Sequence, residues 1–443
     1  MTASPAPSEL VRPDTRWFTD ARFGLFVHWG LYSITGRGEW WKQINEISDE
    51  EYDRYPEHFR ADLYDPAEWA VIARKAGMRY AVLTTKHHDG FCLWDSEFTD
   101  YKATNTPAGR DLVEEFVTAF RAEGLRVGLY HSVIDWHHPH FPIDGVHPHR
   151  AQGDLPGRDI AVYRTYLHNQ VRELITRFNP DTFWFDLSYP ESFDHGGGGS
   201  TGPWWGGKGR DAWGSAELVA MVRELSPHTL INDRLDYPEG TDYITPEELT
   251  LHEQPTEDGR PVVWETCRTL NGIWGYGPRL FSDWFDANSV AGLLVDAVSK
   301  NGNLLLNVGP TARGEFDRRS TDILHALGEW TRRHGDAIYG AGASALPAPH
   351  GCKLTERDGR VYVHVLAWPS SALVLPDFGA TVKFASFVHD GAELRVERMD
   401  YAEQLHSPHQ RPQAPEGAFI VHLPRERPDV LVPVIELDLE PRR

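Results

Sequence analysis

The stretch Thr182-Phe183-Trp184-Phe185-Asp186 is central to the fold, because it is a short apolar run that ends in a carboxylate. It follows a helical stretch and an Asn-Pro break, a pattern that predicts a buried parallel strand with Asp186 at its C-terminal end. Barrel enzymes carry their catalytic groups at that end of the strands. A charged carboxylate beside hydrophobic residues is costly to desolvate without a partner, so Asp186 is a candidate site residue. A helix N-cap is the alternative interpretation.

Strand-like and helix-like stretches alternate on both sides of this run. The expected strands cover residues 23–29, 80–85, 126–130, 182–185, 229–231, 262–265 and 303–308, and the expected helices cover residues 66–77, 111–124, 160–178, 216–225, 290–300 and 321–334. Such alternation predicts an α/β fold with a parallel sheet, and this number of units suggests a (β/α)8-like barrel. We expect the barrel to span residues 15–345, after a lead of residues 1–14.

The pattern changes beyond Pro347. Residues 361–366, 372–375, 382–388 and 430–439 are strand-like, are separated by turn-forming residues and show no helical periodicity. These features predict a C-terminal antiparallel β-sandwich over residues 346–443 as a second, smaller domain. Its short strands carry no signature of a functional site.

The composition narrows the classes of function. The 443 residues include 44 Lys and Arg against 65 Asp and Glu, and the formal net charge of -21 disfavours nucleic acids and anionic membranes as partners. Three distant cysteines form neither a disulfide framework nor a spaced metal cluster. The first residues show no signal-peptide pattern, and no apolar run approaches the ~20 residues of a membrane span. We therefore expect a soluble cytoplasmic protein, and leave its association into a homo-oligomer open.

Several polar residues lie at or after the ends of expected strands. His28 lies near the end of the first strand, and Glu39 and Trp40 lie in the loop after it. His87 and His88 follow the second strand, where adjacent residues point to opposite faces, so only a bend or bulge would direct both at one ligand. Adjacent histidines make a poor metal pair, and hydrogen bonds to hydroxyl groups are the better interpretation.

Two further stretches invite other hypotheses. Five histidines occur from His137 to His149 and suggest a metal site, but prolines interrupt the stretch and no ligand spacing is recognisable. The Gly-rich residues 195–209 lack the strand-to-helix context of a phosphate loop. We interpret them as a loop near the mouth of a site or as a plain insertion.

A carboxylate at a strand end, acids on neighbouring loops, many tryptophans and no cofactor motif fit glycoside hydrolysis. This chemistry needs one ionised carboxylate at the anomeric carbon and one protonated carboxyl group that assists the leaving oxygen. Asp186 is the first candidate. The second is Glu247, Glu248, Glu265 or Glu39, because sequence spacing does not measure the separation across a cleft.

Eight short motifs occur in order over nearly all of the expected barrel. They are 22–30 (RFGLFVHWG), 38–41 (GEWW), 85–91 (TKHHDGF), 184–186 (WFD), 232–234 (NDR), 245–247 (TPE), 274–276 (WGY) and 303–310 (NLLLNVGP). Together they resemble the α-L-fucosidases of glycoside hydrolase family 29. Each motif alone is weak, whereas the combination is highly specific.

The resemblance implies a retaining exo-hydrolase that removes terminal α-L-fucose from a fucosylated oligosaccharide or fucoside, without a metal or organic cofactor. Asp186 would be the nucleophile and Glu247 the acid/base, with Glu248 and Glu265 as alternatives. The residues that would bind fucose or close its pocket are His28, Glu39, Trp40, His87, His88, Tyr130, Trp184, Arg234 and Trp274.

Two departures from the family pattern bear on specificity. Leu187-Ser188 replaces the familiar glycine after the nucleophile, and the Gly-rich run after Pro190 is longer than usual. We expect an altered preference for the leaving group rather than lost activity. The rival hypotheses are a fucose-binding protein without catalysis, which needs no acid/base, and a metal-dependent hydrolase built on the histidine-rich stretch, which a chelator would inactivate.

Overall fold

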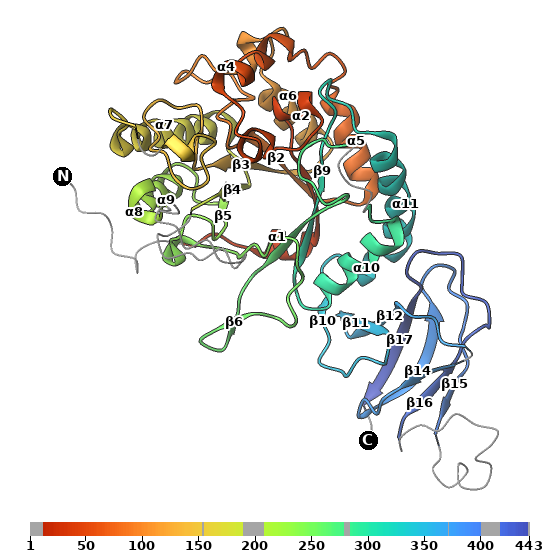
Figure 1. Ribbon diagram of the computed structural model, residues 1–443. Coiled ribbons are helices and arrows are strands. Elements are labelled where there is room, and N and C mark those ends of the chain that lie inside the picture. Colours follow the sequence, from red (N-terminus) through yellow and green to blue (C-terminus); the bar gives the residue numbers. More distant parts are fainter. Residues whose placement is uncertain are drawn as a thin grey trace.

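A curled parallel sheet forms the centre of the larger part of the molecule (Figure 1). The computed structural model describes residues 12–152, 155–188, 208–278, 284–370, 372–399 and 417–441. Within them the sheet has seven strands in the order β5-β4-β3-β2-β1-β9-β8, and all neighbours are parallel. The strands are β1 (Phe23–Val27), β2 (Tyr80–Lys86), β3 (Arg126–Ser132), β4 (Thr182–Asp186), β5 (Leu230–Ile231), β8 (Glu265–Thr269) and β9 (Asn303–Val308). A parallel sheet is what the alternating sequence pattern predicts.

Helices cover the outer face of this sheet (Figure 1). These helices are α5 (Pro66–Ala76), α6 (Leu112–Ala122), α7 (Ile160–Phe178), α9 (Ser215–Leu225), α10 (Ala287–Val298) and α11 (Arg318–His334). Shorter helices before the first strand and in the connections are α1 (Arg16–Ala21), α2 (Tyr32–Thr35), α3 (Trp41–Ile44), α4 (Asp49–Tyr52) and α8 (Arg210–Trp213). Aspartates accept hydrogen bonds from first-turn N–H groups of α5, α6, α7, α10 and α11, which explains where these helices begin. Since helices shield the sheet, β1, β2, β4 and β9 are buried along their whole length.

A short extended segment lies between the edge strands β5 and β8. Single parallel bridges pair Asn232 with Tyr243, Ile244 with Trp264, and Glu247 with Cys267. The chain then forms the hairpin β6 (Thr256–Glu257) and β7 (Arg260–Pro261). The strand expected at residues 262–265 was wrong in position, because the Val262 N–H bonds the Pro255 carbonyl oxygen of this hairpin and the strand begins only at Glu265.

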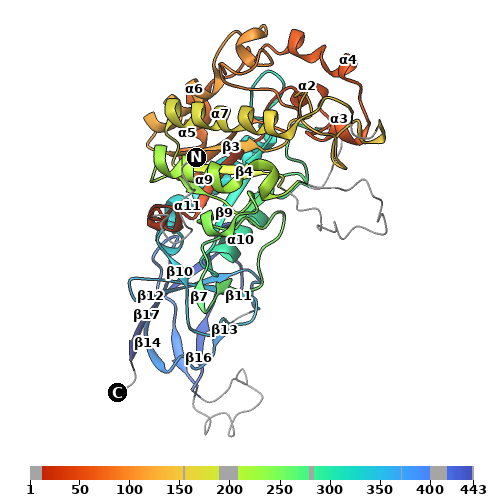
Figure 2. The ribbon, with the colours of Figure 1, turned by 90° about the vertical axis from the view of Figure 1, so that its left-hand side faces the viewer.

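The C-terminal part of the chain contains two antiparallel sheets (Figure 2). One has the order β10-β11-β12-β17-β14 and is built from Gly342–Ala343, Cys352–Arg357, Arg360–Val365, Val434–Pro441 and Ala380–Phe387; the other has the order β13-β16-β15 and is built from Ala372–Leu375, Phe419–His422 and Val396–Arg398. Side chains of both sheets share one hydrophobic cluster, which includes Val363 and Ile435 with Leu375 and Val421. Strands β10, β11, β15 and β16 were not predicted; β10 has only two residues, and charged residues interrupt β11 and β15.

The two parts of the chain pack against each other. Trp330 of α11 donates its indole N–H to the carbonyl oxygen of Val432 at 2.8 Å, and both residues belong to the large cluster of the first part. His334 at the end of α11 and His364 on β12 are buried near this contact. Two imidazoles and one indole N–H are therefore buried where the two parts of the chain meet.

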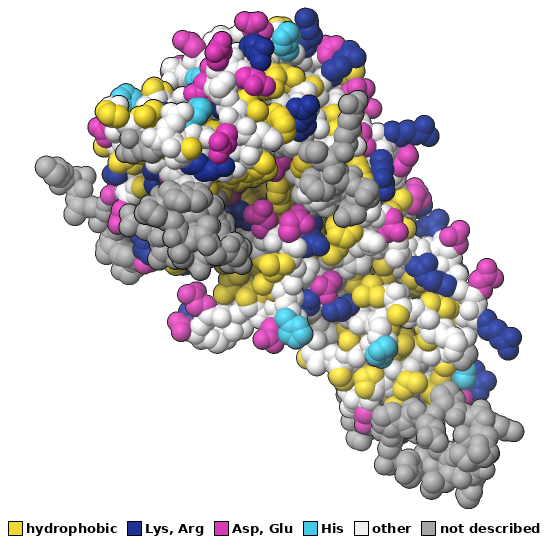
Figure 3. All heavy atoms as spheres, in the orientation of Figure 1, with side chains coloured by type: hydrophobic (Ala, Val, Ile, Leu, Met, Phe, Trp, Pro, Cys, Tyr) yellow, Lys and Arg dark blue, Asp and Glu magenta, His cyan; other side chains and the backbone are white. Residues whose placement is uncertain are grey.

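The surface carries charges of both signs. Asp and Glu side chains lie among Lys and Arg side chains over the face in Figure 3. Most of the Gly-rich stretch 195–209 lies outside the described residues. Within the described residues, no helix has both the length and the apolar character that a membrane crossing requires.

Acidic pH should destabilise the protein, because buried histidines are neutral in the folded state. Burial lowers the pKa of His364 to about 3 and that of His334 to about 4. Histidines in the unfolded chain take up protons as the pH falls below about 6.5, whereas these two do not, so protonation favours unfolding. We expect the unfolding temperature to fall between pH 7.5 and pH 5.0. His364 alone should lower the free energy of unfolding by about 2 kcal/mol at pH 5.

The His364→Gln variant is the control for this effect. It should lose less stability than the wild type over the same pH range when both are followed by thermal unfolding. An identical pH dependence of the two proteins would contradict the explanation.

Candidate active site

Asp186 lies at the C-terminal end of β4, and the backbone around it is held on both sides. Oδ1 of Asn232 accepts a hydrogen bond from the Phe185 N–H and its Nδ2 donates to the Phe185 carbonyl oxygen, both at 2.9 Å. The Val133 N–H donates to the carbonyl oxygen of Asp186 at 3.0 Å. The carboxylate of Asp186 therefore has a defined position.

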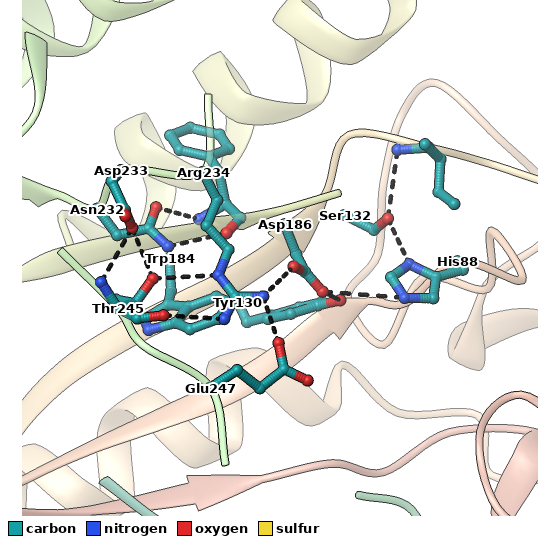
Figure 4. Close-up of polar contacts among 12 residues, drawn as sticks. His88, Tyr130, Ser132, Trp184, Asp186, Asn232, Asp233, Arg234, Thr245 and Glu247 are labelled. Atoms are coloured by element: carbon teal, nitrogen blue, oxygen red, sulfur yellow. Dashed lines mark hydrogen bonds and ion pairs between the residues drawn. The ribbon is translucent and has the colours of Figure 1, made fainter. Parts of the chain in front are cut away.

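Three polar side chains surround this carboxylate (Figure 4). The Tyr130 hydroxyl donates to Oδ2 at 2.7 Å, Nη1 of Arg234 donates to Oδ1 at 2.8 Å, and Nε2 of His88 lies 3.8 Å from Oδ2. The Asp186 side chain is 11% exposed, so a ligand can still reach it. The two donors orient its oxygens and compensate for the partial desolvation of a negative charge.

Arg234 is fixed by the segment between β5 and β8. Its Nε donates to Oγ1 of Thr245 and its Nη2 donates to the Thr245 carbonyl oxygen, each at 3.1 Å. The guanidinium carbon lies 4.5 Å from the centre of the Trp184 ring. Burial disfavours its charge, but the carboxylates of Asp186 and Glu247 outweigh burial and raise the pKa of Arg234 well above its usual value. Arg234 therefore stays a cation.

Glu247 shares this cation with Asp186 (Figure 4). Nη1 of Arg234 donates to Oε2 of Glu247 at 2.7 Å and to Oδ1 of Asp186 at 2.8 Å, so the two acceptor oxygens lie no farther apart than the sum of these distances. This limit is shorter than the separation of about 6.5–9.5 Å between the two carboxyl groups of inverting glycosidases. The Glu247 side chain is 43% exposed, so Glu247 lies at the mouth of the site and Asp186 inside it.

The two alternative acids lie outside this arrangement. Oε1 of Glu248 accepts a hydrogen bond from the Thr269 N–H at 2.6 Å. Glu265 is fully buried behind Trp184, whose indole Nε1 lies 3.3 Å from Oε1 of Glu265. Neither acid is among the described residues that line the cavity beside Asp186.

The three histidines of the site are neutral hydrogen-bonding groups. Nδ1 of His28 lies 2.7 Å from Oδ1 of Asn307, and Nδ1 of His88 lies 2.8 Å from Oγ of Ser132. Nδ1 of His87 is buried and has no hydrogen-bond partner within the part of the chain that the structure describes. Burial lowers the pKa of His28 to about 3, and the pKa values of His87 and His88 lie well below the usual value for the same reason. Such imidazoles can donate to or accept from sugar hydroxyls.

Adjacent His87 and His88 both line the cavity because the end of β2 is irregular. The pairing of β2 with β3 shifts between Thr84 and Lys86, and β2 ends at Lys86. This is the kind of irregularity that the sequence required for two neighbouring histidines to face one ligand.

These groups enclose a cavity with an empty volume of about 370 Å³, part of it open to solvent. Its lining consists of the polar residues His28, His87, His88, Tyr130, Asp186, Arg234 and Glu247 and the apolar residues Phe26, Trp40, Trp184, Leu187, Cys267 and Trp274. Aromatic walls with a few convergent polar groups suit a sugar, because its C–H faces pack on rings and its hydroxyls need hydrogen bonds. The structure thus brings together every predicted sugar-binding residue except Glu39.

Glu39 supports the cavity wall instead of lining it. Its Oε2 accepts a hydrogen bond from the Gly275 N–H at 2.8 Å, directly after Trp274. Nδ2 of Asn307 donates to the Trp274 carbonyl oxygen at 2.7 Å. Supporting residues that were not named as site residues from the sequence are Ser132, Asn232, Thr245 and Asn307. The last three lie within recognised motifs, and that was the available signal.

Leu187, directly after Asp186, has a left-handed backbone conformation. Its φ of 68° costs a residue other than glycine about 1 kcal/mol or more. The next residue is anchored, because the indole Nε1 of Trp213 donates to Oγ of Ser188 at 3.0 Å. The half-buried Leu187 side chain lines the cavity.

The histidine-rich stretch makes contacts within the protein. His137 stacks on Tyr101 with ring centres 3.8 Å apart, and Oδ1 of Asp135 accepts hydrogen bonds from the backbone N–H groups of His137 and His138. Across the described ranges, no group of three or more His, Cys, Asp or Glu side chains is arranged to hold a metal ion.

The chain is similar to α-L-fucosidases over most of its length. A family model described as Alpha-L-fucosidase matches residues 3–336. The tissue alpha-L-fucosidase of Rattus norvegicus is 30% identical over 399 residues, which cover 83% of this chain and 79% of the rat protein. The solved structure of alpha-L-fucosidase isoenzyme 1 from Paenibacillus thiaminolyticus is 42% identical with a TM-score of 0.86, and the match covers 98% of this chain and 100% of that one.

A second solved structure is a trapped covalent intermediate. It is the GH29 alpha-L-fucosidase of Bacteroides thetaiotaomicron in complex with 2-fluoro-fucosyl fluoride, and it is 28% identical to this chain, with a TM-score of 0.81 and coverage of 98% of each chain. Both this structure and that of the Paenibacillus enzyme match nearly the whole chain. The protein therefore belongs to the alpha-L-fucosidase family, glycoside hydrolase family 29.

Proposed function

We propose that the protein is a retaining exo-α-L-fucosidase that removes terminal α-L-fucose from oligosaccharides or simple fucosides. The observation that carries this proposal is the arrangement of two carboxylates on one cation. Arg234 bonds Asp186 inside the cavity and Glu247 at its mouth. An inner carboxylate suits a nucleophile, and an outer one suits an acid/base that meets the leaving group.

The reaction proceeds in two displacements. First, Asp186 attacks C1 of the fucose while the bond from C1 to the leaving oxygen breaks, and Glu247 gives its proton to that oxygen. In the second step Glu247 takes a proton from water, the water oxygen attacks C1, and the ester bond to Asp186 breaks. Two inversions at C1 retain its configuration.

The protein groups around the sugar have separate tasks. Arg234 and Tyr130 hold both oxygens of Asp186 in place for attack. A sugar that binds between the two carboxylates separates Glu247 from Arg234 and shields Glu247 from water. Both effects favour the protonated form of Glu247. The neutral histidines bind hydroxyls, and Trp40 and Trp274 pack against C–H faces. No step needs a metal or an organic cofactor.

Family membership also supports a closed barrel, a C-terminal β-sandwich and a fucoside as the binding partner. In this proposal the segment 243–247 completes a (β/α)8-like barrel over residues 15–345, and the two C-terminal sheets form a β-sandwich over residues 346–443. The partner is a fucosylated oligosaccharide or fucoside. The net charge of -21 supports the absence of nucleic acids and anionic membranes from its partners.

Replacement of Asp186 by glycine should abolish normal turnover. We expect kcat on an aryl fucoside to fall by roughly 10³-fold or more, because the variant has no nucleophile, while the unfolding temperature changes little. Added azide should restore part of the activity and give a fucosyl azide of inverted configuration. A variant with wild-type turnover would refute the assignment, and a wild type that binds fucose but never hydrolyses an aryl fucoside would favour the non-catalytic alternative.

Replacement of Glu247 by alanine should affect substrates according to their leaving groups. A good leaving group needs little help from an acid, so kcat/KM should fall about 10²-fold more for a poor leaving group than for a good one. Rates for a series of aryl fucosides give this slope. If Glu265→Ala shows the slope and Glu247→Ala does not, the acid/base is Glu265.

Leu187 should influence the leaving group rather than the fucose. Leu187 directly follows Asp186 and lines the same cavity as Glu247, whose exposed side chain lies at the mouth where the aglycone leaves. Leu187→Asn keeps a side chain that tolerates the left-handed conformation but is polar, so kcat/KM for an aryl fucoside should fall several-fold relative to that for a fucosyl disaccharide. Inhibition by free fucose should not change. Equal losses on both substrates would contradict this role.

A further inference from the structure

Glu265 is a buried carboxyl group that the proposed mechanism does not use. It lies on β8, behind the floor of the cavity, and its side chain is fully buried. The Tyr80 hydroxyl donates to Oε2, and the indole N–H of Trp184 donates to Oε1 at 3.3 Å. Among the described residues, no Lys or Arg side chain forms an ion pair with Glu265. A carboxyl group in such a place is costly and calls for a physical reason.

Trp184 supports both groups that hold Asp186. Its ring lies 4.5 Å from the guanidinium carbon of Arg234 and stacks on the Tyr130 ring with centres 5.6 Å apart. Arg234 and Tyr130 are the two donors to the carboxylate of Asp186. A rotation of the indole would therefore displace both donors together.

We propose that Glu265 is a positioning residue, which fixes the indole of Trp184 and, through it, the donors that aim the carboxylate of Asp186. This inference rests on the proposed function, because it concerns the attack by Asp186. Glu265 does not touch the sugar, and its effect reaches the reacting atoms only through Trp184.

Four other buried indoles show that an indole does not need a carboxyl partner, although Trp94 also donates to a carboxylate, that of the half-buried Glu173. The indole N–H groups of Trp29, Trp69, Trp264 and Trp330 donate to the backbone carbonyl oxygens of Thr311, Gly314, Lys300 and Val432. A backbone carbonyl satisfies an indole N–H without the cost of a buried carboxyl group. The carboxyl group of Glu265 instead links two side chains, Trp184 and Tyr80, across the interior of the sheet.

Glutamine is the matched control for this role. Burial raises the pKa of Glu265 to about 7, so the neutral acid is well populated near neutral pH. Gln has nearly the same shape as that neutral acid and keeps an acceptor oxygen for Trp184. Met has a similar volume and no such acceptor, so it removes the hydrogen bond and leaves the packing.

The test is the rate at which 2-fluoro-fucosyl fluoride labels the protein. Fluoride leaves with little help from an acid, so this rate reports the attack by Asp186 rather than the proton transfer by Glu247. We expect Glu265→Met to label about tenfold more slowly than the wild type or slower still, because a misplaced nucleophile loses near-attack geometry. Glu265→Gln should label within about twofold of the wild-type rate.

Each other outcome overturns the inference. Labelling of both variants at the wild-type rate would show that Glu265 does not position Asp186. If both variants also hydrolyse substrates with poor leaving groups slowly, Glu265 is the acid/base. Equal slowing of both variants would show that the negative charge matters rather than the bond to Trp184. A wild type that is not labelled at all would refute the proposed function itself.

If the Glu265→Met protein does not fold, a second variant still tests the inference. Trp184→Phe keeps an aromatic ring and removes the indole N–H, so it should slow labelling to a similar extent. If both single variants fold, the double variant should label no more slowly than either one, because the two residues act through one bond. Labelling of Trp184→Phe at the wild-type rate, or fully additive losses, would contradict the inference.

Discussion

One guanidinium group between two carboxylates is the interaction on which the site depends. Asp186 and Glu247 are like charges held close together in a partly buried cavity, and Arg234 provides the positive charge that makes this arrangement stable. Each partner comes from a different piece of backbone: the end of β4, the loop after β5, and the segment that reaches β8. The curvature of the sheet therefore brings the three residues together.

The remaining residues of the site act by holding these groups in position. Asn232 fixes the end of β4, Thr245 fixes Arg234, and Ser132 and Asn307 orient two of the histidines. Most of these contacts are made by buried polar side chains, which are costly unless they are fully bonded. Such a network leaves the site little freedom to rearrange, and a defined geometry is what nucleophilic attack requires.

The sequence was sufficient for the order of the parallel strands and longer helices and for most of the residues that line the cavity. Residues 160–178 form a helix with the predicted bounds, and Asp186 ends a buried strand as its apolar run indicated. Periodicity and motifs depend on local sequence, so they reveal these features. The choice among Glu247, Glu248 and Glu265 depends on distances between β4 and β8, residues that lie far apart in the chain. The irregular end of β2 and the support that Glu39 gives to Gly275 also depend on tertiary contacts.

The most direct test of the central role of Asp186 is to identify the residue that becomes covalently attached to the sugar. The wild-type protein would be treated with 2-fluoro-fucosyl fluoride and digested, and the labelled peptide would be sequenced by mass spectrometry. We expect a single fluorofucosyl group in ester linkage to Asp186, within the peptide that contains residues 182–188. Attachment to Glu247, Glu265 or any other residue would contradict the assignment of Asp186 as the nucleophile.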